Sequence, residues 1–203
     1  MNEKKKLFQS IIFPAIFLIV IWLVKITEIT LDTDFVYLGI YPLQWRGLIG
    51  ILTAPLIHAD LRHLFDNSIP VFLLSTAVFY FYKPVALKVF FLTWIITGIL
   101  VWLGGRSSYH IGASGLIYGF ASFLFFSGII RNSINLMAIS LLVVFMYGGL
   151  IWGILPYDYK ISWESHLFGA LTGLSLAIVY RHYGPALPAE MPDENNENQE
   201  YEN

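Results

Sequence analysis

Three short stretches of the sequence carry polar side chains whose types and spacing could perform acyl transfer. They contain His63 with Asn67, Ser114 with Tyr118, and His166. A serine hydroxyl is a poor nucleophile until a neighbouring base takes its proton. An imidazole can be that base because it is mostly neutral at pH 7. The sequence therefore offers Ser114 as a nucleophile and His166 as its general base.

Acyl transfer also needs hydrogen-bond donors for the negative charge that develops on the attacked carbonyl oxygen. Asn67 offers a side-chain amide, His63 a ring N–H, and Ser114 its own backbone N–H. His63 and Asn67 are four residues apart, so they share one face of a helix. Gly112 and Gly115 flank the serine, and glycines let another part of the chain approach the backbone closely. We therefore expect an oxyanion hole formed by His63, Asn67 and Ser114.

Each of these features also has a purely structural interpretation. His63 and Asn67 could cap a helix or hydrogen-bond two helices to each other. Ser114 could bond the backbone of its own helix, and His166 could be a buried histidine with a satisfied partner. It is the combination of nucleophile, base and donors in one chain that favours catalysis.

The composition indicates that these residues belong to a membrane protein. Hydrophobic residues make up 57% and charged residues 13% of the chain, against roughly 45–50% and 25% in average soluble domains. Several apolar blocks approach the roughly 20 residues that span a bilayer as a helix. We predict an all-α, polytopic membrane bundle with six transmembrane helices, at residues 8–24, 64–82, 85–103, 114–130, 134–155 and 163–180. The apolar piece 48–57 is too short to cross and is expected to form a loop in the membrane interface.

The predicted spans bring the polar residues to one depth. His63, Ser114 and His166 fall near the starts of the second, fourth and sixth spans, which begin on the same side of the membrane. Gly169 and Gly173 follow His166 by about one and two helical turns, and such spacing lets helix backbones approach closely in lipid. The strip would let the sixth span press against the fourth and bring the base to the serine, although ordinary helix packing uses the same pattern.

The placement of lysine and arginine favours a cytoplasmic N-terminus, because a lysine cluster at residues 4–6 directly precedes the first span. With six spans the C-terminus is then cytoplasmic as well, and Lys25 lies on the external side. Organelle targeting signals are not recognisable, so the cell (inner) membrane is expected. We divide the chain into a membrane domain, 1–184, and an acidic tail, 185–203, whose composition predicts disorder.

The sequence disfavours several other classes of protein. The chain has no cysteine, which excludes disulfides and thiolate metal sites. Its net charge of -2 offers no basic face for nucleic acid. His58 and His63 are five residues apart and do not form the His-Glu-x-x-His pattern of a zinc protease. We therefore predict neither a metal nor a cofactor.

The polar residues form three motifs in a particular order along the chain. The motifs are His63-Leu64-Phe65-Asp66-Asn67, then Gly112-Ala113-Ser114-Gly115 followed by Tyr118-Gly119, then His166-Leu167-Phe168-Gly169 followed by Gly173. In these motifs the chain resembles the rhomboid family of intramembrane serine proteases, over roughly residues 45–180.

The resemblance implies a catalytic dyad of Ser114 and His166 without a third, acidic member. It implies that Tyr118 packs against the His166 ring and fixes its orientation, and that His63 and Asn67 help to line the oxyanion hole. The implied partners are the lipid bilayer and transmembrane protein substrates, which would be cut within it.

Four other positions near the motifs receive no catalytic role. His58 resembles an additional, structural histidine of the family. Trp45-Arg46 resembles a dipeptide of the family's first loop, but the spacing differs, so no role is carried over to Arg46. Asp66 is expected to face the membrane interface. Glu164 lies two residues before the histidine base and therefore points to a different helix face.

Two other functions remain open at this stage. A catalytically inactive rhomboid-like protein that binds membrane proteins is the first, although such proteins typically lack the serine or histidine that this chain has. A small transporter is the second, since polar residues within spans are typical of transporters. Here the polar residues gather toward one side, and the sequence contains no evident inverted repeat.

Overall fold

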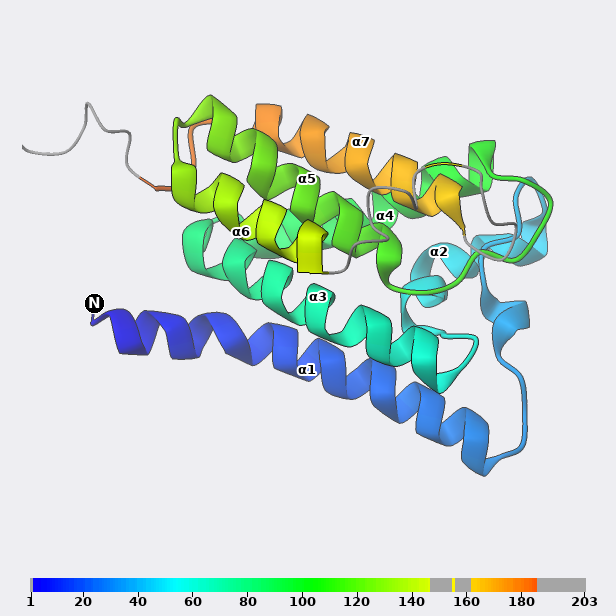
Figure 1. The fold of residues 1–203 in the computed structure, drawn as a ribbon. Coiled ribbons are helices and arrows are strands. Elements are labelled where there is room, and N and C mark those ends of the chain that lie inside the picture. The colour runs from blue at the N-terminus through cyan, green and yellow to red at the C-terminus, as the bar shows by residue number, and fades with distance from the viewer. Residues whose placement is uncertain (1, 147–154, 156–161, 186–203) are drawn as a thin grey trace, which may run out of the picture.

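The computed structural model describes residues 2–146, 155 and 162–185, and within these residues the chain is helical without β-strands (Figure 1). This confirms the all-α prediction. The described α-helices are α1 (Glu3–Thr30), α2 (Gly50–Thr53), α3 (Leu61–Phe81), α4 (Ala86–Gly104), α5 (Ser114–Ile130), α6 (Ile134–Met146) and α7 (Trp163–Val179). Three short 3-10 helices lie in the loop between α1 and α3: η1 (Val36–Leu38), η2 (Trp45–Leu48) and η3 (Ala54–Leu56).

Three of the described helices, α1, α3 and α4, are long and apolar enough to cross a membrane. The apolar helix α5 is shorter, at 17 residues. The helix count differs from the six predicted, because seven α-helices are found in the described part of the chain. The additional one, α2, is a four-residue turn in the stretch expected to form an interfacial loop. Residues 147–154 of the predicted fifth span, and the tail 186–203, lie outside the described residues.

Helix α1 extends beyond the apolar stretch 8–24 at both ends. At its start the side chain of Asn2 accepts a hydrogen bond from the backbone N–H of Lys4, which is an N-cap. At its end Lys25 and Glu28 form an ion pair across one helical turn, with Nζ and Oε2 2.6 Å apart. Because each charge has a partner, the helix continues through both residues to Thr30.

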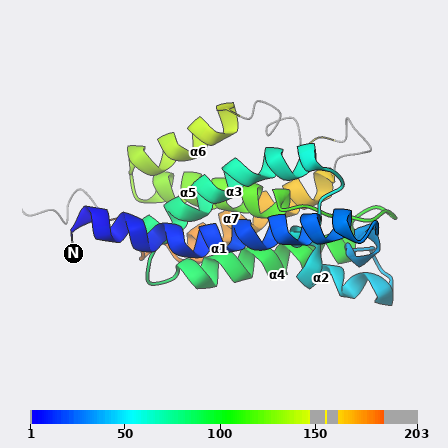
Figure 2. The same ribbon diagram turned by 90° about the horizontal axis from the view of Figure 1, so that it is seen from below.

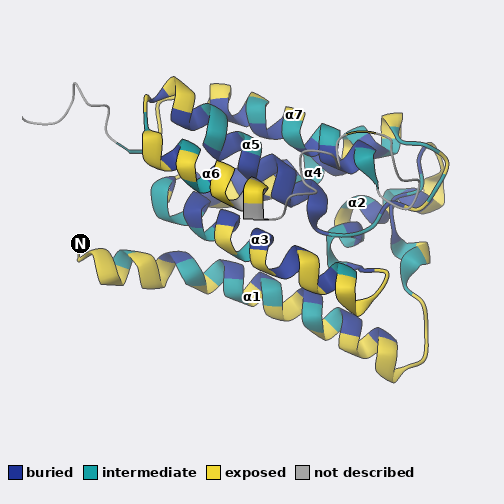
Figure 3. Cartoon of the chain, viewed as in Figure 1, coloured by how far each residue is buried: buried dark blue, intermediate teal, exposed yellow. Residues whose placement is uncertain are grey.

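Helix α5 lies at the centre of the bundle (Figures 1 and 3). It packs most extensively against α7, and also against α6, α3 and α4. Large side chains from it, among them Phe120, Phe123 and Leu124, are fully buried. Helix α1 packs against α3 on the outside of the bundle and exposes much of its remaining surface, as Figures 2 and 3 show. The interior of the fold is thus built around the helix that begins with Ser114.

Helices α5 and α7 meet backbone to backbone along glycines. A Cβ atom built on Gly169 would collide with the carbonyl oxygen of Gly115, and one built on Gly173 would collide with that of Gly119. Contact at this range leaves no room for any side chain. The close approach predicted from the glycine spacing is therefore present.

The first residues of α3, α5 and α7 lie at the same end of the bundle, where α2 also lies (Figure 1). All three helices run from this end toward the other, with α4 and α6 returning between them. Polar residues in their first turns can therefore meet, as the alternation of spans predicted.

Gly173→Val is expected to destabilise the bundle, because its Cβ has no space against the Gly119 carbonyl. Overpacking of this kind costs roughly 1–3 kcal/mol, which corresponds to a fall of about 2–12 °C in the unfolding midpoint for a chain of this size. Thermal unfolding in detergent measures the shift. Ser175→Val is the control, since it adds the same side chain at an exposed position of α7. Equal midpoints for the two variants would contradict the backbone contact.

Candidate active site

Ser114 is the first residue of α5, and the backbone before it is shaped by Gly112. Gly112 has a φ of +100°, a conformation that glycine adopts without a steric penalty. A Cβ atom at this position would lie 2.7 Å from Nε2 of His63. The N–H of Gly112 donates to the carbonyl oxygen of Ala54, 2.9 Å away. The serine therefore follows a turn that only glycine fits, anchored on the loop between α2 and α3.

The side chains of Ser114 and His166 meet where α5 and α7 begin. Oγ of Ser114 lies 2.8 Å from Nε2 of His166, a normal hydrogen-bond distance. Both residues are buried, with 9% and 7% of their surface exposed. His166 is in the first turn of α7, directly before the glycine strip that holds this helix against α5. Residues 52 positions apart in the sequence thus share one contact.

Tyr118 lies one turn beyond Ser114 and stacks on the imidazole of His166. The ring centroids are 4.2 Å apart and the ring planes differ by 12°. Tyr118 is itself buried, with 7% of its surface exposed. A stacked, enclosed ring limits rotation of the imidazole, so the Nε2 atom stays directed at the serine.

His63 and Asn67 lie on one face of α3, beside the turn that precedes Ser114. Nε2 of His63 lies 2.7 Å from the position that a Cβ atom on Gly112 would take, and Nδ2 of Asn67 lies 3.4 Å from it. Nδ2 of Asn67 is buried and has no hydrogen-bond partner among the described residues. The backbone N–H of Ala59 donates to Nδ1 of His63, 3.4 Å away, which assigns the ring hydrogen to Nε2. Both side chains therefore direct a donor toward the same turn.

His58 supports this turn from the loop before α3. It is 1% exposed, and burial lowers the pKa of its ring to about 3, with the nearby charge of His63 acting in the same direction. The ring is therefore neutral at pH 7, and its Nε2 atom accepts the N–H of Ala113 at 3.4 Å. The ring also packs edge-on against His63, with centroids 5.0 Å apart.

The structure contains a buried polar cluster that the sequence did not reveal. Glu164 is 2% exposed, and its carboxylate accepts the backbone N–H of Arg106 at 3.3 Å and lies 3.4 Å from the guanidinium. The ring of His110 bonds Ser162 Oγ at 2.6 Å, and Ser162 bonds Ser165 Oγ at 2.6 Å. Burial lowers the pKa of His110. The cluster ties the loop between α4 and α5 to the start of α7.

One signal in the sequence could have identified the cluster. An acidic residue at the start of an apolar helix needs a partner. The sequence pattern indicates which helix face Glu164 occupies, away from the base, but it does not indicate the partner of the carboxylate. Arg106 and His110 lie in a loop, where side-chain directions do not follow a period, so their contact with Glu164 depends on the fold.

Three other residues considered from the sequence are exposed at the surface. Asp66 is exposed on α3, with an oxygen 3.8 Å from Arg62. Trp45 and Arg46 are exposed in η2. Within residues 2–146, 155 and 162–185, no three His, Cys, Asp or Glu side chains gather in a way that could hold a metal ion.

A small pocket of about 30 Å³ lies behind the serine turn. Its lining combines apolar side chains with Gly112, Gly115, Thr97, His110 and Ser165. A water molecule needs roughly 10–15 Å³ of such volume, so the pocket is large enough to hold one.

Comparison with known proteins assigns this arrangement to a family. The family described as Rhomboid domain matches residues 44–183, which is more than half of the chain. An uncharacterized protein of Mycobacterium tuberculosis (strain ATCC 25618 / H37Rv) is 36% identical over 148 residues, 68% of this chain and 62% of the relative. An uncharacterized protein of Mycobacterium leprae (strain TN) is 34% identical over 175 residues, 81% of this chain and 67% of the relative.

The chain spans about 62% of the length of the first of these relatives, and helix α1 lies outside the segment that the family match covers. The matched segment contains all three polar motifs and the helices that carry them. With its apolar helices and this match, the chain is a multi-pass membrane protein that belongs to the rhomboid family.

Proposed function

We propose that this protein is an intramembrane serine endopeptidase, which hydrolyses peptide bonds of transmembrane protein substrates with a dyad of Ser114 and His166. The observation that carries the proposal is the contact of 2.8 Å between Ser114 Oγ and His166 Nε2 in a buried site. Membership of the rhomboid family supports it.

The first chemical step is proton transfer within the dyad. Nε2 of His166 takes the hydroxyl proton of Ser114 as Oγ attacks the scissile carbonyl carbon. This requires an imidazole that carries its hydrogen on Nδ1. The resulting imidazolium then gives its proton to the leaving amine, which leaves an acyl group on the serine. Tyr118, stacked on the ring at 4.2 Å, keeps Nε2 directed at Oγ in both transfers.

Three donors are available for the oxyanion that forms during the reaction. The N–H of Ser114 is in the first turn of α5, where backbone N–H groups have no acceptor within the helix and the helix dipole favours negative charge. Nε2–H of His63 and Nδ2 of Asn67 border the same turn. A buried amide without a hydrogen-bond partner costs stability. The oxyanion, which exists only during the reaction, would supply the partner that Nδ2 of Asn67 lacks.

Release of the product acid requires water at the acyl-serine. The pocket behind Gly112 and Gly115, with about 30 Å³ of volume, has room for roughly two waters. His166 then acts again as a base, taking a proton from the attacking water. A substrate helix must unwind locally first, since its carbonyl groups are bonded within the helix.

The proposal includes the topology of the chain. Six transmembrane spans, with both termini in the cytoplasm of a cell-membrane protein, would put the dyad in the external half of the bilayer. The proposal also takes residues 1–184 as the membrane domain and 185–203 as a tail that is acidic by composition.

Ser114→Ala is expected to abolish cleavage of a model transmembrane substrate in liposomes, because alanine provides no nucleophile. Labelling by a fluorophosphonate probe should disappear with it. Ser127→Ala is the matched control, as it removes a buried serine of the same helix far from the dyad and should keep both signals. Wild-type protein that binds membrane proteins but neither cleaves nor takes the probe would instead be an inactive member of the family.

Asn67→Leu is expected to lower kcat/KM by about 10²–10³-fold, the usual effect of losing one oxyanion donor. Its unfolding midpoint should not fall, because the change removes a buried amide nitrogen that has no partner among the described residues. Substrate kinetics and thermal unfolding of the same preparation test both statements. An unchanged kcat/KM would remove Asn67 from the oxyanion hole.

Gly169→Val is expected to reduce kcat, because its side chain would displace the start of α7 from Gly115 and move His166 away from the serine. A shift of about 1 Å in a reacting group can cost roughly 10²-fold in rate. Cleavage is measured per folded molecule, with Leu171→Val as the control at an exposed position of α7. Full activity of Gly169→Val would show that the dyad does not depend on this contact.

A further inference from the structure

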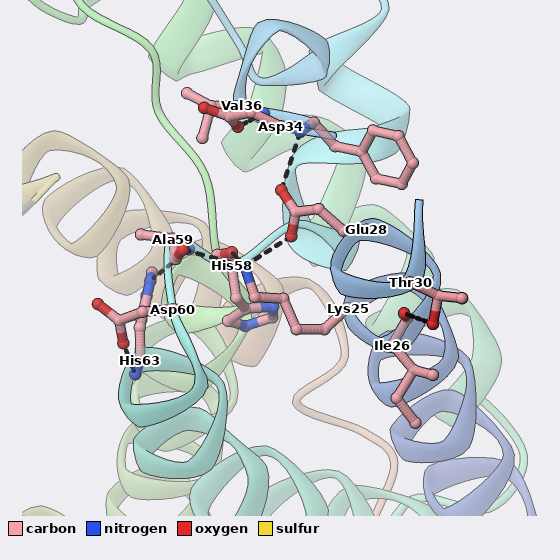
Figure 4. Close-up of polar contacts among 11 residues, drawn as sticks. Lys25, Ile26, Glu28, Thr30, Asp34, Val36, His58, Ala59, Asp60 and His63 are labelled. Carbon is pink, nitrogen blue, oxygen red and sulfur yellow. Dashed lines mark hydrogen bonds and ion pairs between the residues drawn. The ribbon is translucent and has the colours of Figure 1, made fainter. Parts of the chain in front are cut away.

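Helix α1 carries a buried cation close to the candidate active site. Lys25 and Glu28 are 7% and 6% exposed, although α1 lies on the outside of the bundle and lies outside the family match at 44–183. The sequence places Lys25 on the external side, in a segment of mixed character that follows the first apolar stretch. In the structure its side chain points toward the loop before α3, as Figure 4 shows.

The ammonium group of Lys25 donates to three oxygens. Nζ lies 2.6 Å from Oε2 of Glu28, 2.9 Å from the carbonyl oxygen of His58, and 3.0 Å from that of Ala59 (Figure 4). An ammonium has three hydrogens to donate, so all of them are used. The other carboxylate oxygen of Glu28 accepts the N–H of Phe35 at 2.8 Å. The buried pair is therefore fully hydrogen-bonded.

Stability alone does not explain why such a pair is buried here. Removing two charges from water is costly, and well-packed hydrophobic residues of similar volume often serve a fold as well or better. What apolar side chains cannot do is hold two carbonyl groups of another segment in a fixed position. The geometry therefore points to a role in positioning the segment 58–59.

His58 and Ala59, whose carbonyl oxygens bond Lys25, also contact the site through the His58 ring and the Ala59 N–H. His58 accepts the N–H of Ala113 on its ring, directly before the serine. Ala59 donates its N–H to Nδ1 of His63, the bond that assigns the ring hydrogen to the side facing Gly112. Two series of contacts therefore start at Lys25 of α1. One passes through His58 to the serine turn, and the other passes through Ala59 to the candidate oxyanion donor His63.

We propose that Lys25, paired with Glu28, is a positioning residue of the active site. It fixes His58 and Ala59 by their carbonyl oxygens, and so sets the backbone at Ala113 and the orientation of His63. This inference rests on the proposed proteolytic function. It assigns to α1 a role in catalysis, in addition to its packing against α3.

The test compares Lys25→Met with the double variant Lys25→Met/Glu28→Met. The single variant leaves the Glu28 carboxylate buried without its cation, so both unfolding midpoint and kcat should fall. The double variant removes both charges, so its midpoint should return to within a few degrees of wild type. Its kcat should stay roughly 10- to 100-fold low, the order expected for a misplaced reacting group, with KM within about threefold.

Lys88→Met is the matched control, since it makes the same substitution at an exposed position of α4 and should match wild type in midpoint and kcat. All rates are divided by the folded fraction of each preparation. If the double variant is poorly stable, Lys25→Met alone tests the inference. Its kcat per folded molecule, measured well below its unfolding midpoint, must then be lower than that of wild type.

Wild-type protein and Ser114→Ala are assayed in parallel to separate the two hypotheses. Equal cleavage by these two would overturn the proposed function, and with it this inference. An active wild type together with a double variant of wild-type kcat would overturn the inference alone, because it would make Lys25 a purely structural residue.

Discussion

The contact between the backbones of α5 and α7 is the constraint on which the rest of the site depends. Gly169 against Gly115, and Gly173 against Gly119, bring the two helices closer than any side chain would allow. Between lipid-exposed helices there is little hydrophobic driving force, so close packing of small residues carries much of the association. The dyad is formed at the end of this contact, because Ser114 and His166 are in the first turns of the helices that it joins.

Around this contact, loop segments determine the orientation of the polar groups. The loop between α2 and α3 accepts hydrogen bonds from the turn before Ser114, at the carbonyl oxygen of Ala54 and the ring of His58. The loop between α4 and α5 is held to α7 by Glu164 and its partners. In a region with little water, a polar group without a partner is costly, so these bonds restrict each loop to one arrangement.

Much of the helical fold could be predicted from the sequence, because long apolar blocks in a chain with few charges have few alternatives. The starts of α3, α5 and α7 followed from the polar residues that interrupt these blocks. The ends of α1 could not be predicted in the same way. Lys25 and Glu28 resemble the start of a polar loop, and only their partners in the fold, the carbonyl groups of His58 and Ala59, allow the helix to continue through them.

The identity and order of the polar motifs follow from the sequence alone, since residue types at helical spacing specify which side chains share a face. The tertiary structure decided the distances: the 2.8 Å between Ser114 and His166, the stacking of Tyr118, and the burial of Lys25 and Glu164. Spacing along one helix is set by its period, whereas contacts between segments far apart in the chain depend on how loops and helices pack, which no local pattern encodes.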